Sequence, residues 1–204
     1  LPERIRLLTQ YQSVPELLTI VGQEPELAKL EELSNQAWSE LVRLVKLGIL
    51  PEKSGVYNRG FRGSLLYLRD QRDLSSAAFA MLDTYNKETG ETLSFYLDGE
   101  SGQILTLELH SEYLLDFDTP VEDIGSAFFN ALGLRYEALD DIQSNHAAFR
   151  LADSDTVYWI IRYDNYLHIT LEMDWRSLDD DTRTAMGYPP GSSVSVDAGP
   201  MQNW

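Results

Sequence analysis

Two stretches of the chain decide the fold: SAAFAMLDTYNKETGETLSFYLDGESGQILTLEL at 76–109 and HAAFRLADSDTVYWIIRYDNYLHITLEM at 146–173. Both contain Ala-Ala-Phe near the start, and both end on a similar apolar-polar pattern, Leu-Thr-Leu-Glu-Leu in the first and Ile-Thr-Leu-Glu-Met in the second. A helix-like segment that closes on Leu-Gly precedes each of them, at Leu47 and at Leu132. This likeness predicts one structural unit written twice.

Alternating apolar residues and turn chemistry predict a three-stranded meander in each unit, because turns rich in Asn, Asp and Gly separate the apolar runs. The expected strands are 77–85, 91–97, 103–109, 146–152, 156–163 and 166–173. Since alternate side chains of a strand share a face, each unit should have one apolar face. We expect that face to include Phe95 in the first unit, and Phe149, Ile161 and Ile169 in the second.

A helix is expected before each meander. After Pro25, apolar residues recur at helical spacing until Gly48 ends the pattern. Before the second unit, Thr119 as N-cap, Pro120 at the first helical position and Glu122 at the third make a capping-box pattern. A helix laid across each apolar sheet face would close the core.

The predicted class is therefore α+β, with two tandem helix-plus-antiparallel-sheet repeats whose sheets are either separate or joined edge to edge. The expected segments are an N-terminal helical segment at 1–24 (one or two short helices), a first repeat at 25–115, a second repeat at 116–175, and a short helix with a loose tail at 176–204. A further strand is expected at Ser64–Arg69.

The charge excludes some partners. The net charge of −17 argues against binding to nucleic acid or to anionic lipid, both of which require a basic surface. Acidity is uneven: residues 98–141 hold eleven Asp or Glu and one Arg, whereas residues 53–72 hold five Lys or Arg and one Asp. The chain has no cysteine, which excludes disulfides, thiolate metal sites and cysteine nucleophiles. It begins at Leu1, which is compatible with the removal of a signal peptide or anchor.

The polar face of the second meander is the candidate ligand site. By alternation we expect it to carry His146, Arg150, Tyr158, Arg162, His168 and Glu172. Its two arginines would bind a carboxylate or phosphate, and either histidine would be the acid–base candidate if the face were catalytic. The alternative is an ordinary polar sheet face with cross-strand charge pairs. No catalytic constellation, metal site or cofactor is predicted.

The loop Arg59-Gly-Phe61-Arg62 is the candidate partner site. Arginine and aromatic residues are typical of contact hot spots. The acidic stretch 98–141 of a second copy would complement it, which predicts weak, salt-sensitive self-association. The alternative is a plain surface loop.

The stretch DGESGQIL at 98–105 resembles the signature of PepSY-type domains, and the helix-then-meander order is similar to cystatin-like folds. PepSY-type domains are small extracytoplasmic modules of bacteria. The resemblance implies a noncatalytic binding, inhibitory or regulatory module outside the cell. We therefore expect a binding or regulatory module that acts through protein or peptide contacts in the extracytoplasmic space or cell envelope, and otherwise in the cytoplasm. It would meet a membrane only through an anchor outside this sequence. The alternative function is an anion-binding protein or enzyme that uses the polar face.

Overall fold

The computed structural model describes residues 1–52, 60–139, 144–152 and 154–174. In chain order, its elements are α1 (Pro2–Ser13), η1 (Pro15–Leu17), β1 (Leu18–Gln23), α2 (Leu27–Lys46), β2 (Arg62–Asp70), β3 (Ser76–Tyr85), β4 (Thr92–Asp98), β5 (Ile104–His110), η3 (Glu112–Leu114), α3 (Val121–Leu132), β6 (Tyr136–Ala138), β7 (His146–Leu151), β8 (Thr156–Tyr163) and β9 (Tyr166–Met173). The α+β class is confirmed. The helix expected near the C-terminus lies outside the described residues.

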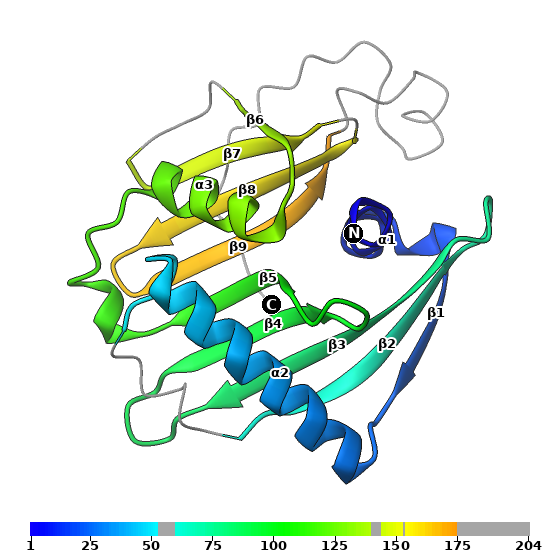
Figure 1. The fold of residues 1–204 in the computed structure, drawn as a ribbon, viewed down its shortest axis with the longest axis horizontal. Helices are drawn as coiled ribbons and strands as arrows, with labels where there is room; N and C mark the ends of the chain where they lie inside the picture. Colours follow the sequence, from blue (N-terminus) through cyan, green and yellow to red (C-terminus); the bar gives the residue numbers. More distant parts are fainter. Residues whose placement is uncertain (53–59, 140–143, 153, 175–204) are drawn as a thin grey trace. The chain divides into compact units, whose positions relative to one another are not determined.

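The nine strands form one antiparallel sheet in the order β1-β2-β3-β4-β5-β9-β8-β7-β6 (Figure 1). The six strands expected in the two meanders are present at nearly the predicted bounds. They join through β5 and β9, where Leu107 lies opposite Ile169 and Leu109 opposite Leu167. The joined alternative is therefore the observed one.

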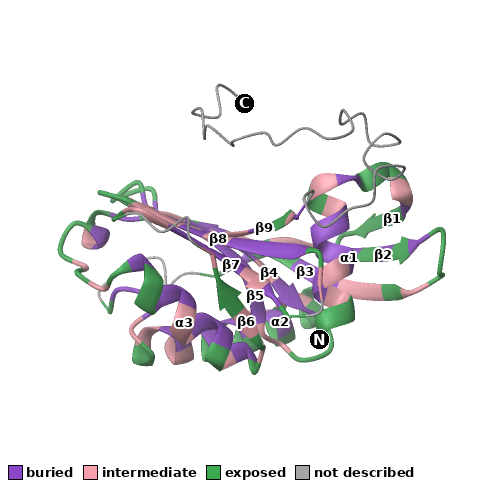
Figure 2. Cartoon of the chain, turned by 90° about the horizontal axis from the view of Figure 1, so that it is seen from above, coloured by how far each residue is buried: buried purple, intermediate pink, exposed green. Residues whose placement is uncertain are grey.

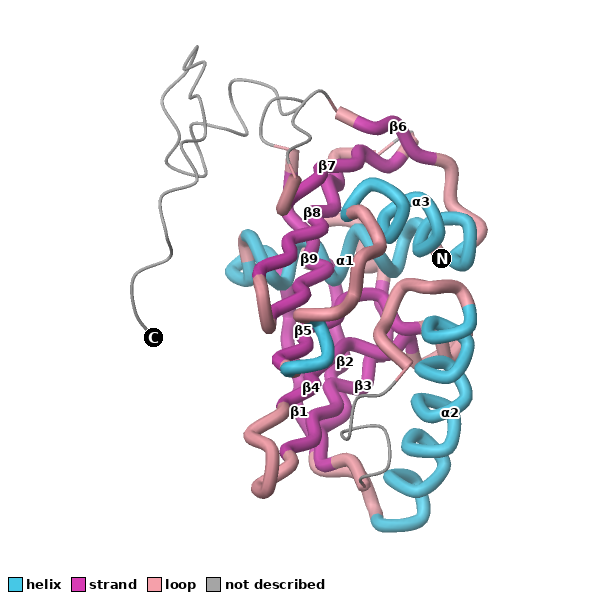
Figure 3. The backbone as a smooth tube through the Cα atoms, turned by 90° about the vertical axis from the view of Figure 1, so that its left-hand side faces the viewer, coloured by secondary structure: helices cyan, strands magenta, loops and turns pink. Residues whose placement is uncertain are grey.

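Helices α2 and α3 lie on the same face of this sheet, which we name the helix face (Figures 1 and 3). The side chains between them and the sheet form the main core; in β4, β5, β8 and β9 these include Leu93, Phe95, Leu107, Ile160 and Ile169. We name the opposite side the open face (Figure 2). Burial of these apolar side chains is the chief force that holds the helices on the sheet.

The first helix, α1, lies in the gap where β9 diverges from β3 and β2 (Figure 1). It contacts β9, β8, β2 and β3, and it buries Ile5, Leu7 and Leu8 completely. Side-chain contacts fix its position on both sides, with Thr9 bonded to Thr156 of β8 (3.1 Å) and Arg6 bonded to Asp70 of β2 (2.9 Å). The helix thus fills the opening between the two halves of the sheet.

Two local expectations were wrong, and one short strand was not predicted. Residues 18–23 form strand β1 rather than a helix, because all of them pair with residues 65–70 of β2. The capping box is absent: α3 begins at Val121 with Pro120 as N-cap, and no side chain caps it. The short strand β6 was not expected, and it pairs with β7 at the far edge of the sheet.

Candidate functional site

The predicted polar face of the second meander is divided between both sides of the sheet. The two-residue turn between β8 and β9 places Tyr163 opposite Tyr166, and this register places Ile160 opposite Ile169. Ile160 is therefore buried under α3, and Ile161 lies half-buried on the open face. The predicted facing of β8 was wrong by one residue, which moves every side chain of the strand to the other face.

Tyr158 and Arg162 consequently lie on the helix face, where both have structural contacts. The Tyr158 ring is fully buried against Phe128 and Phe129, with centroids at 5.9 and 5.1 Å, and burial raises the pKa of its phenol. Arg162 donates from Nη1 to the carbonyl oxygens of Phe117 (2.7 Å) and Thr119 (2.5 Å). Neither residue shares a surface with the other predicted ligand residues.

The Tyr158 hydroxyl has no hydrogen-bond partner among the described residues. A buried hydroxyl without a partner lowers stability, so Tyr158→Phe should raise the free energy of unfolding by roughly 1 kcal/mol. The matched control is Tyr166→Phe on the open face, which should change it by less than about 0.5 kcal/mol. Denaturant unfolding of the three proteins measures both values. A loss of stability in Tyr158→Phe would show that the hydroxyl is bonded.

The open face holds the other four predicted residues, His146, Arg150, His168 and Glu172, by the register of β7–β9. Two of them have polar partners on neighbouring residues of the chain. Arg150 donates to Asp174 (2.8 Å from Nε), and Glu172 accepts from Trp159 Nε1 (2.8 Å).

All three histidines of the chain lie on this face, because His110 of β5 joins the predicted pair. Its Nε2 lies 3.2 Å from Glu108, and its ring centroid lies 4.6 Å from that of Tyr166. Burial lowers the pKa of His168, with Glu108 opposing the shift. Within the described residues no group of three or more His, Asp or Glu is placed to hold a metal. Arg150 is paired and Arg162 lies on the opposite face, so neither predicted arginine is free here to bind an anion.

The predicted partner loop makes contacts within the chain at two of its three residues. Phe61 is 7% exposed, and its ring packs edge to face on Phe95 at 5.4 Å. Arg62 is exposed and forms an ion pair with Asp83 at 2.8 Å. Arg59 lies outside the described residues. Phe61 is therefore a core residue rather than an exposed contact.

A surface that the sequence did not predict lies at strand β1, the edge of the sheet. Its sequence, Leu-Thr-Ile-Val-Gly-Gln, contains no charged residue and no proline, and among the described strands it pairs only with β2. Ile20 and Val21 are 41% and 53% exposed. The amide of Gln71 donates to the carbonyl of Leu17, so alternation directs the backbone groups of Ile20 and Gly22 away from β2, toward the free edge. The edge strands of natural sheets are usually protected by charged residues, proline or bulges, and β1 contains none of these.

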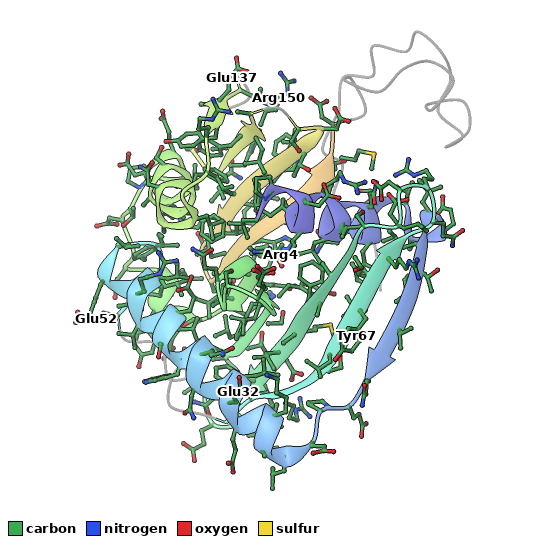
Figure 4. All side chains as sticks on the ribbon, turned by 45° about the vertical axis from the view of Figure 1, so that its right-hand side comes forward. Arg4, Glu32, Glu52, Tyr67, Glu137 and Arg150 are labelled. Carbon is green, nitrogen blue, oxygen red and sulfur yellow. The ribbon has the colours of Figure 1, made fainter. Side chains whose placement is uncertain are left out.

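A groove of about 680 Å³ borders this edge on the helix face. Its lining includes Arg4, Val21, Tyr67, Arg69, Ala78 and Glu100. Figure 4 shows Tyr67 on β2, between α1 and α2, with Arg4 on α1 beyond it. An extended segment added to β1 would place every second side chain over this groove.

The turn between β4 and β5, which carries the sequence pattern noted at 98–105, forms one wall of the groove. Asp98 is fully buried and accepts from Arg4 Nε (2.8 Å) and from the Ser101 amide (2.9 Å). The Gly99 amide donates to the Ala78 carbonyl at 2.9 Å. A Cβ at Gly99 would lie 2.7 Å from that oxygen, so the close approach requires glycine.

No family model, curated protein or solved structure matches this chain. In the part of the chain that the structure describes, no helix combines the length and the apolarity needed to cross a membrane.

Proposed function

We propose that this protein is a noncatalytic binding module, and that it takes an extended segment of a partner protein as an additional strand on β1. The observation that carries the proposal is the unprotected edge of β1, where Ile20 and Val21 are exposed and Val21 lines the groove. In strand addition, main-chain hydrogen bonds supply affinity and pockets for alternate side chains supply specificity. This surface offers both.

The open face is a weaker candidate for the function. Several of its polar side chains are already paired: His110 with Glu108, Arg150 with Asp174, and Glu172 with Trp159. An anion site or an enzyme on this face therefore has less support than a binding edge.

Two further parts of the proposal rest on the sequence. We propose that the segment from α2 to β5 and the segment from α3 to β9 are copies of one unit; their shared order, a helix followed by four strands, supports this. The resemblance to PepSY-type modules supports an extracytoplasmic location. Fractionation of cells that produce the full-length protein tests the location, and recovery only in the cytosol would contradict it.

Selection from a displayed library of random octapeptides tests strand addition. We expect the full chain to enrich peptides with alternating β-branched residues, because such residues favour an extended strand. An Ile20→Pro variant should weaken their binding by about tenfold or more, since proline removes the outward N–H and disrupts pairing at the edge.

The matched control is Ile20→Val, which keeps the N–H and should keep the affinity. Because the Ile20 amide points away from β2, Ile20→Pro should retain the β1–β2 ladder and its circular dichroism spectrum. A selection that enriches no peptide would overturn the proposed function. Peptides that bind Ile20→Pro as well as they bind the parent would place the site elsewhere.

A further inference from the structure

The groove beside β1 contains a cation without a counterion. Every other described arginine has a partner: a carboxylate or backbone carbonyl for most, and an interaction with a neighbouring residue for Arg135. Arg69 has none, although the protein carries a net charge of −17. Its neighbour in the groove, Arg4, is already bound to Asp98 (2.8 Å) and Glu100 (2.5 Å). Arg69 is thus the one described guanidinium in the groove that is free to receive a carboxylate.

The register places Arg69 within reach of a strand added to β1. Arg69 lies opposite Thr19, and Tyr67 lies opposite Val21, with all four side chains on the helix face. Strands lie about 4.8 Å apart, so an added strand would lie roughly 10 Å from β2. An arginine and a glutamate side chain together span that distance, and Thr19 between them is small. A residue opposite Val21 would meet the apolar surface of Val21 and Tyr67 instead.

We infer that the partner is an extended acidic-apolar segment, in which an apolar residue is followed two positions later by Asp or Glu. This inference rests on the proposed strand addition and names the chemistry of its ligand. In an antiparallel addition, the apolar residue lies opposite Val21 and the acid lies opposite Thr19, next to Arg69. Both side chains point into the groove, since residues two apart share a face. The intervening residue lies on the other side, beside Ile20.

The test compares the strongest peptide from the octapeptide selection with the same peptide in which its acid is replaced by glutamine. The parent chain should bind the acidic form about two- to fivefold more tightly, the range expected for one exposed charge pair. The preference should fall as salt is added, because screening weakens exposed pairs. An Arg69→Gln variant should bind both forms equally. Adding Ile20→Pro to that variant should still weaken its binding of either peptide. Selection on an Arg69→Glu variant should replace the acid with Lys or Arg.

The outcomes separate this inference from the proposed function. Peptides that depend on Ile20 but bind equally in their acidic and glutamine forms would overturn the acidic partner and leave strand addition standing. A selection without enrichment, or one whose peptides ignore Ile20→Pro, would overturn both. An acidic preference that survives Arg69→Gln would assign the carboxylate to another group and overturn the inference.

Discussion

Ile160→Asp should destabilise the protein by about 4 kcal/mol or more, whereas Ile161→Asp should cost about 1 kcal/mol. The side chain of Ile160 in β8 is fully buried under α3, so the variant would place an unpaired carboxylate in the core. Ile161 lies half-buried on the open face, opposite His168 and His146. The small expected loss at this position reflects the poor strand propensity of aspartate.

Chemical denaturation of the two variants and the parent measures this difference. The pair is matched, because both changes have the same chemistry in adjacent residues of one strand. Equal losses in the two variants, or a larger loss for Ile161→Asp, would show that the register of β8 is wrong.

The second large effect is expected at Asp70, which joins α1 to the end of β2. Its carboxylate is fully buried and accepts from Arg6 Nη1 (2.9 Å), from Arg72 Nη2 (2.8 Å) and from the Arg72 amide (2.8 Å). Asp70→Ala should cost about 3 kcal/mol. This cost lies at the low end of the range for breaking a buried ion pair, because both arginines keep contact with water. Asp73→Ala removes an exposed partner of the same Arg6 and should cost less than about 1 kcal/mol. Similar losses in both variants would contradict the account of this network.

The same carboxylate should make stability depend on pH. Hydrogen bonds from Arg72 hold the pKa of Asp70 well below its ordinary value, despite the opposing effect of burial. A depressed folded-state pKa stabilises the protein above the unfolded-state value of about 3.9, and this stabilisation is lost as the pH falls toward the folded-state value. Parent and Asp70→Asn should therefore converge in stability as the pH is lowered from about 5 to 2. A constant difference across this range would contradict the assignment.

The strands that could be predicted from the sequence are those with clear turns. The meander strands β3, β4 and β5 were found because Asn86–Gly90 and Asp98–Gly102 mark their ends, and the same holds for β7–β9. The side of the sheet that each β8 side chain occupies was predicted wrongly. The reason is that Val-Tyr-Trp-Ile-Ile is apolar at both its odd and its even positions, so alternation does not show which set is buried. The turn at Asp164-Asn165, which marks the ends of these strands, also fixes their register. A two-residue hairpin loop pairs Tyr163 with Tyr166, and counting back from it places Ile160, not Ile161, opposite Ile169.

The β1 edge, at which we propose binding, could not be predicted from local sequence patterns. Thr19-Ile20-Val21 has strand propensity, but β1 exists through pairing with β2, between residues as distant as Leu18 and Asp70. The groove depends in turn on α1, which reaches Asp98 through Arg4. Pairings this far apart in the chain leave no periodic signal near either partner.

The measurement that tests the central claim most directly is backbone hydrogen exchange in the full chain, free and bound to the strongest selected octapeptide. In the free chain the amides of Thr19 and Val21, which face β2, should exchange more slowly than those of Ile20 and Gly22, which face the free edge. Binding should slow exchange at Ile20 and Gly22 and leave Thr19 and Val21 nearly unchanged. Saturating peptide that leaves Ile20 and Gly22 exchanging at the rate of the free chain would contradict strand addition at β1.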